Sequence, residues 1–275
     1  MLTIRSVVNV TLAAALLAAG TCHAQQPAPS TPTAPVPGAA SATEAAPAPV
    51  IQAEAIDALK EMGAYLRTLK TFSVTADVTV DEVLLSGQKI QVSGENTMTV
   101  RRPDRLRGTM RKDETEIDAE FYYDGKTFTI YGKKVKYYAS APAPATIAAV
   151  FDAISERFDV DIPLADLFAW STDKSKMQDI TSALYIGPAR IGGVLTKHYA
   201  FRQEGIDWQV WIEQGKTRLP RKLVITTVGE EGQPQYVSLL KWNLAPTISD
   251  KMFTFVPPKD AHRIVFAGQT PAATK

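Results

Sequence analysis

Apolar and polar residues alternate between Ile90 and Arg107 with the period of two that is typical of a strand with one buried face. If this period continues, Arg102 rather than Arg101 falls on the apolar face, directly before Pro103 ends the strand. Because an unpaired buried charge is costly, Arg102 either finds acceptors inside a cavity or reaches water where the strand twists. The pattern leaves both open. The apolar face of this strand carries Ile90, Val92, Met98 and Val100.

The same alternation recurs before and after this strand. Residues 72–81 form a half-buried strand, Leu106 and Met110 continue the pattern after Pro103, and residues 121–131 read as a hairpin that turns at Asp124 and Gly125. Further strands are expected at 183–186, 197–203, 207–213, 221–227 and 236–243. The economical interpretation is a meander of consecutive antiparallel strands.

Two regions follow the helical period instead. Residues 53–70 carry Ile56, Leu59, Met62, Leu66 and Leu69 at helical spacing. In the second region Thr146 can cap a helix, and Pro163 begins another short segment after it. The apolar stripes of this pair are Ile147, Val150, Phe151, Ile154 and Phe158, then Leu164, Leu167, Phe168 and Trp170. The pair either packs permanently on the sheet or forms a movable cover, and the pattern leaves both open.

The N-terminus predicts export. Arg5 precedes an apolar run, and small residues end at Ala24, so residues 1–24 read as a signal peptide cleaved after Ala24. Lipidation at Cys22 is the less favoured alternative. Cleavage removes Arg5 and the one cysteine of the chain, which leaves 29 basic and 29 acidic residues. The mature protein therefore depends on its core rather than on disulfides.

Composition then sets the domain boundaries. Residues 25–50 are almost entirely Ala, Pro, Thr, Ser and Gln, as in a disordered linker, and residues 266–275 form a small polar tail. Between them, residues 51–265 are long enough for one domain with a substantial core. No internal repeat divides this stretch.

Motifs for catalysis are missing from the sequence, so we expect no enzyme, no cofactor and no metal. The acidic residues between Asp113 and Glu120 could bind calcium, but their even spacing is that of a solvated strand edge. The basic residues between Arg101 and Lys112 do not predict nucleic-acid binding in an exported protein of zero net charge, although anionic lipid head groups are an alternative. Trp208, Trp211 and Trp242 are expected in the core or in cavity walls.

Three segments in register resemble the periplasmic lipoprotein carriers of the Lol type. They are residues 100–106, residues 124–131 and residues 253–259. The chain resembles still more closely an uncharacterised family of predicted periplasmic proteins in that superfamily, through residues 58–66 and 162–167. The resemblance implies an α+β fold in the periplasm: a strongly curved antiparallel sheet, an unclosed half-barrel, with helices over its concave face. It also implies that Arg102 hydrogen-bonds the helical lid in the empty state.

The expected function is therefore binding of a lipid, an acylated peptide or another hydrophobic ligand between sheet and lid, by a monomer. The long Pro/Ala linker and residues 163–167 depart from the carriers, so lipoprotein transfer itself is not implied. The alternative is an envelope sensor that binds a membrane protein partner through the same fold. The ligand cavity is expected to be lined by Met98, Val100, Arg102, Leu106, Met110, Phe128, Ile130, Ile147, Val150, Phe151 and Ile154.

Overall fold

The computed structural model describes residues 50–115, 117–158, 164–169 and 177–266. The predicted signal peptide, nearly all of the predicted linker, and the tail after Phe266 lie outside these residues. Pro163 and Trp170 also lie outside them, as does the side chain of Phe158.

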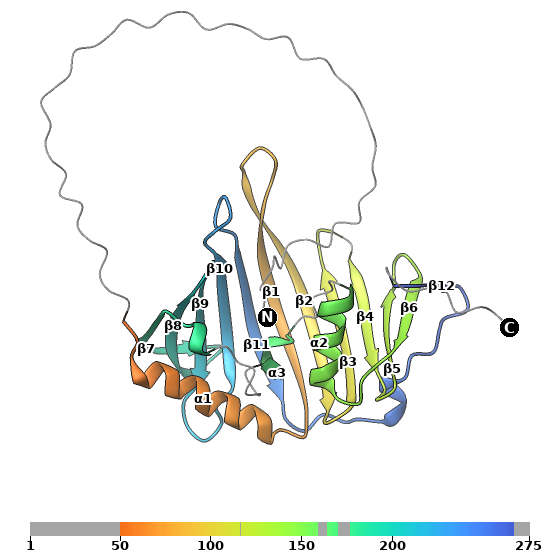
Figure 1. Ribbon diagram of the computed structural model, residues 1–275, viewed down its shortest axis with the longest axis horizontal. Coiled ribbons are helices and arrows are strands. Elements are labelled where there is room, and N and C mark those ends of the chain that lie inside the picture. The colour runs from red at the N-terminus through yellow and green to blue at the C-terminus, as the bar shows by residue number, and fades with distance from the viewer. Residues whose placement is uncertain (1–49, 116, 159–163, 170–176, 267–275) are drawn as a thin grey trace, which may run out of the picture. The chain divides into compact units, whose positions relative to one another are not determined.

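The described residues form one sheet of twelve strands in the order β12-β6-β5-β4-β3-β2-β1-β11-β10-β9-β8-β7 (Figure 1). Neighbouring strands are antiparallel, except that β12 runs parallel to β6. β7 and β12 lie at opposite ends of the order, so the sheet is not closed. The strands are β1 (Thr71–Val83), β2 (Lys89–Arg101), β3 (Arg105–Lys112), β4 (Asp118–Tyr123), β5 (Thr127–Gly132), β6 (Tyr137–Pro142), β7 (Ser182–Ile191), β8 (Val194–Gln203), β9 (Ile206–Glu213), β10 (Pro220–Thr227), β11 (Gln235–Asn243) and β12 (His262–Ile264).

The helices are α1 (Ala53–Thr68), α2 (Ile147–Phe158) and α3 (Asp166–Ala169), with short 3-10 turns η1 (Met177–Asp179) and η2 (Asp250–Phe253). The predicted first helix, the hairpin of residues 121–131 and the helix after Thr146 are confirmed within a few residues. Of the predicted segment that begins at Pro163, the described residues contain the helix α3. The cap is also confirmed, since Oγ1 of Thr146 accepts a hydrogen bond from the backbone N–H of Ala149 at 3.3 Å.

One face of the sheet, here called the inner face, carries most of the buried apolar residues of both halves. Val78 pairs with Ser238, Ser238 pairs with Leu223, and directly paired residues point to the same side. The inner face therefore continues from β1 through β11 into β10. Helices pack on both halves of this face, which confirms the predicted α+β fold with helices over one face of an unclosed sheet.

Two apolar clusters divide the inner face. In the first, buried residues of β1 to β6 pack with α2 and α3; in the second, α1 packs against β7 to β10. Figure 1 shows α1 in orange, running across the ends of β7 to β10, and α2 in green, lying over β2 and β3. Leu69, Tyr236 and Trp242 pack against both clusters. Trp242 also donates its indole N–H to the carbonyl of Pro220 at 2.8 Å, which fixes the ring at this junction.

The segments before α1 and after β11 border the two ends of the sheet. The backbone N–H of Gln52 donates to the carbonyl of Ala183 on β7 at 2.8 Å. After β11, Asp250 pairs with Arg101 of β2 at 2.6 Å. Nearer the other end of the sheet, the ring of Phe255 lies 5.1–5.4 Å from Tyr122, Tyr131 and Tyr138 of β4 to β6. The residues after β11 thus cross the outer face before they reach β12.

Burial of α1 gives a first testable prediction. Met62 is 0% exposed and lies in the second cluster, so Met62→Ala should leave a cavity and lower the free energy of unfolding by about 2–5 kcal/mol. Lys60→Ala, on the solvent side of the same helix, is the matched control and should change stability little, because its ion pair with Asp57 is exposed. Denaturant unfolding measures both; equal effects would contradict this packing of α1.

Candidate functional site

Ten of the eleven residues expected to line a cavity lie together in the first apolar cluster. They come from β2, β3 and β5 and from the facing side of α2, and Val100 pairs directly with Leu106 across two strands. In this structure their side chains pack against one another. Met98, Val100, Leu106, Phe128, Ile147, Val150 and Ile154 are buried, and Met110, Ile130 and Phe151 are partly buried against them.

The first turn of α2 is tied to the turn between β2 and β3. The backbone N–H of Ile147 donates to the carbonyl of Pro103 at 3.0 Å. The hydroxyl of Tyr123 donates to the carbonyl of Pro144, in the proline-rich stretch that precedes the helix. Burial raises the pKa of Tyr123 to about 12, so its hydroxyl remains a donor at any physiological pH. These bonds fix where α2 begins, and its apolar stripe then faces the sheet.

Arg102, the eleventh residue, lies against α3. Its guanidinium carbon is 4.8 Å from the centre of the Phe168 ring, and its backbone N–H donates to the carbonyl of Lys70 at 2.8 Å. Burial lowers the pKa of Arg102 from its ordinary value, but an arginine so placed still carries its charge. Hydrogen bonds from Arg102 to the lid's carbonyls stay a prediction. The contact observed is with an aromatic ring.

Phe168 connects the elements of this site. It is 2% exposed, and its ring lies 6.2 Å from that of Phe72 on β1 and 5.0 Å, edge to face, from that of Phe151 on α2. The cation of Arg102, the strand β1 and the helices α2 and α3 therefore meet at one side chain. The helical spacing of residues 164–170 indicated a short apolar segment, but it did not indicate which strand residue Phe168 would contact.

Sequence reasoning missed further residues of this cluster. Phe72, Tyr123 and Leu240 lie on strands that the sequence predicted. Strand alternation indicates which residues are buried, but it does not indicate which buried residues belong to the site. Phe266 is buried in the same cluster, one residue beyond the predicted end of the domain. No periodic pattern marks Phe266, because it follows a strand of three residues.

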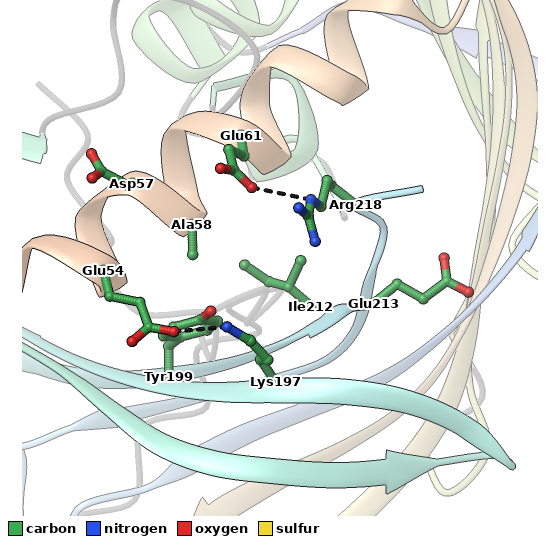
Figure 2. A pocket seen from close by; sticks show the side chains of 9 residues that line it. All are labelled: Glu54, Asp57, Ala58, Glu61, Lys197, Tyr199, Ile212, Glu213 and Arg218. Atoms are coloured by element: carbon green, nitrogen blue, oxygen red, sulfur yellow. Dashed lines mark hydrogen bonds and ion pairs between the residues drawn. The ribbon is translucent and has the colours of Figure 1, made fainter. Parts of the chain in front are cut away.

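A hollow of about 280 Å³ lies on the other half of the inner face, beside α1 (Figure 2). Two ion pairs cross this hollow from α1: Glu54 pairs with Lys197 at 2.8 Å, and Glu61 pairs with Arg218 at 3.1 Å. Its lining is Glu54, Asp57, Ala58, Glu61, Lys197, Tyr199, Ile212, Glu213 and Arg218. Figure 2 shows the carboxylates of Asp57 and Glu213 pointing away from its centre. Such a polar lining does not match the apolar cavity that the sequence predicts, and the residues predicted to line that cavity belong to the other half.

The acidic residues between β3 and β4 are engaged with bases and backbone. Asp113 pairs with Arg111 at 2.9 Å, Asp118 with Lys133 at 3.4 Å, and Glu114 accepts from the backbone N–H of Ser93 at 2.8 Å. Across the described residues, no group of three or more His, Cys, Asp or Glu side chains is placed to hold a metal ion. Within those same residues, every helix is too short or too polar to cross a membrane.

His198 stacks on Trp211, with ring centres 3.9 Å apart, and its Nε2 lies 3.0 Å from Oε1 of Gln209. Burial lowers the pKa of His198, so the ring favours the neutral form at neutral pH. A stacked imidazole that pairs with an amide acts here as a structural side chain of the outer face.

Solved structures with similar folds were found at low sequence identity. An uncharacterized conserved protein from Thermus thermophilus aligns over 77% of this chain and 99% of its own, with TM-score 0.43 and 10% identity. Lipoprotein LppX from Mycobacterium tuberculosis aligns over 70% and 99%, with TM-score 0.42 and 14% identity. The MucA/MucB complex of Pseudomonas aeruginosa aligns over 74% and 62%, with TM-score 0.41 and 17% identity.

Among the curated proteins compared with this chain, none matches its sequence. A family described as a predicted periplasmic protein, DUF2092, matches residues 55–267, which include nearly the whole described sheet and its helices. The family description agrees with the periplasmic location expected from the sequence, and it confirms the resemblance to an uncharacterised periplasmic family. The chain belongs to the DUF2092 family of predicted periplasmic proteins.

Proposed function

We propose that this periplasmic protein binds a hydrophobic ligand, a lipid or an acylated peptide, between the inner face of β1 to β6 and the lid formed by α2 and α3. It does so as a monomer and without catalysis. The observation that carries the proposal is the way the lid is held. Ile147 binds the turn between β2 and β3, Tyr123 at the end of β4 binds Pro144 just before α2, and Arg102 lies over the ring of Phe168. The buried side chains that α2 turns toward the sheet are apolar.

Such an arrangement lets a ligand replace the lid's apolar contacts with its own. The inner face offers an apolar surface continuous from Met98 to Phe128, and α2 supplies an apolar stripe opposite. If the lid moves away, an acyl chain can bury its methylenes against both, at about 0.8 kcal/mol for each one. Affinity should then depend on chain length rather than on the polar head group.

The function is tested by native mass spectrometry of the protein purified from a bacterial periplasm, followed by titration with fatty acids of increasing length. We expect co-purified lipid and an affinity that rises about fourfold per methylene until the site is filled. A protein that carries no lipid, binds no fatty acid and instead captures an inner-membrane partner would reject this function in favour of an envelope sensor.

Placing a charge in the site tests its position. Ile154→Asp puts a carboxylate among the buried residues that face the sheet, so fatty-acid affinity should fall at least about tenfold, because a buried unpaired charge is costly. Ser155→Asp, one residue away on the exposed side of α2, is the matched control and should bind like the wild type. Isothermal titration calorimetry compares the three proteins. Equal affinities would place the ligand elsewhere.

The contact between Arg102 and Phe168 gives a prediction about release. Arg102→Leu keeps the position apolar but removes the cation from the ring, a contact worth about 1 kcal/mol, so the fatty-acid off-rate should rise roughly fivefold. Stopped-flow displacement measures this rate.

The control for Arg102→Leu must be an arginine that does not touch the lid. Arg101 is unsuitable, because it pairs with Asp250 and lies over the ring of Phe253. Arg111 lies on the outer face of β3, pairs only locally with Asp113 in the described contacts, and is largely exposed. Arg111→Leu should leave the off-rate unchanged. If both variants give the same off-rate, Arg102 does not hold the lid closed.

A further inference from the structure

The residues after β11 change faces of the sheet at its β6 end. Phe253 is buried and Phe255 packs on tyrosines of the outer face. The chain then runs as β12 beside β6, and two residues later Phe266 lies among the buried residues of the inner face. This stretch therefore passes around the border of the sheet and ends in the cluster to which the proposed function assigns the ligand.

Phe266 is the one buried residue of this last stretch, which runs from Asp260 to Phe266. It is 9% exposed, and its ring stacks with that of Phe128 at a centre-to-centre distance of 6.4 Å and an angle of 19°. By contrast, Ile264 is 48% exposed, Val265 is 44% exposed, and all three side chains of β12 face solvent. The strand itself pairs with β6 over three residues only.

The described side-chain contacts that this stretch makes before Phe266 are exposed. Lys136 pairs with Asp260 in an exposed position, and the ring of His262 lies 5.7 Å from that of Tyr137. Exposed ion pairs of this kind contribute little, and a short edge strand is easily lost from a sheet. Among the described contacts, the buried part of this attachment comes from one aromatic ring, which is placed in an apolar site.

We propose that the ring of Phe266 occupies the subsite for the far end of the ligand's apolar chain, on Phe128, and that ligand binding displaces residues 262–266 from the sheet. This inference rests on the proposed function. It adds where the far end of the ligand binds and names the side chain that competes for that position. A phenyl ring and an acyl terminus bury the same kind of surface, so one can take the place of the other. In the empty protein the ring shields Phe128 from water.

If the ring of Phe266 competes with the ligand, removing the ring should strengthen ligand binding, and fixing the ring in place should weaken it. Because the fraction of protein with an open subsite scales the apparent affinity, Phe266→Ala should strengthen binding of N-phenyl-1-naphthylamine, a fluorescent apolar probe, by about tenfold. Val265→Ala, the exposed neighbour, is the matched control and should leave the affinity unchanged. If Phe266→Ala does not fold, Phe266→Leu takes its place, with a smaller increase expected.

A cavity left by the smaller side chain could itself take up the probe, so a second variant fixes the native ring in place. Tyr137 and His262 are directly paired across β6 and β12, and paired backbone positions suit a disulfide. The double variant Tyr137→Cys and His262→Cys, oxidised, should bind the probe about tenfold more weakly than the same protein after reduction. Thiol titration confirms that the bond has formed; if it has not, cysteines at the next paired positions, Tyr138→Cys and Arg263→Cys, take its place.

The outcomes separate this inference from the function on which it rests. If the wild type binds the probe and fatty acids, but neither Phe266→Ala nor oxidation of the cysteine pair alters the affinity, the subsite assignment is overturned and the binding function stands. If the wild type and every variant fail to bind either molecule, both are overturned. Opposite shifts in the two variants, with Val265→Ala unchanged, establish the subsite.

Discussion

An unclosed sheet with one apolar face is the constraint on which the rest of this structure depends. A closed barrel covers its own interior, whereas this sheet must find cover for an apolar surface spread over two halves. The chain meets the constraint with one long helix on the β7 to β10 half and with short helices on the other. The two halves of the inner face are therefore covered by different kinds of element.

On the α1 half, the cover is a helix of sixteen residues whose buried face is fully engaged and whose rim is tied by ion pairs. On the other half, cover comes from α2, from the four residues of α3 and from a single ring of Phe266. Each of these pieces is shorter than α1. A molecule built to release its cover would use such pieces where the ligand enters and a continuous helix where it does not.

Arg102 shows how a charge can serve an apolar site. An apolar residue at this position would leave the ring of Phe168 without its contact to a cation. The guanidinium instead lies over the ring of Phe168, where it loses some hydration but gains the attraction of the ring. A cation–π contact depends on the position of the cation over the ring, so it influences the position of α3 as well as the strength with which α3 is held.

Periodicity predicted much of this from the sequence. Strand alternation identified the inner-face residues from Phe72 to Ile130, and the spacing in residues 147–154 identified the side of α2 that faces them. It could not predict the contact of Arg102 with Phe168, the burial of Phe266 or the hollow beside α1. These depend on segments far apart in the chain meeting in space, and short segments such as α3 and β12 carry too few residues to show a period.

The seam between β1 and β11 has a consequence for how the protein acquires its structure. Every other antiparallel pair in the sheet joins strands adjacent in the sequence, whereas Ser73 pairs with Asn243 across almost the whole domain. Local hairpins close quickly, but pairing of distant strands must overcome the entropy of a long loop. The two meanders, β1 to β6 and β7 to β11, can therefore form before the seam does. Until β11 pairs with β1, the backbone groups along that edge of β1 have no strand partner. In the periplasm, that interval is when the nascent protein is most exposed to chaperones, to proteases and to wrong strand partners.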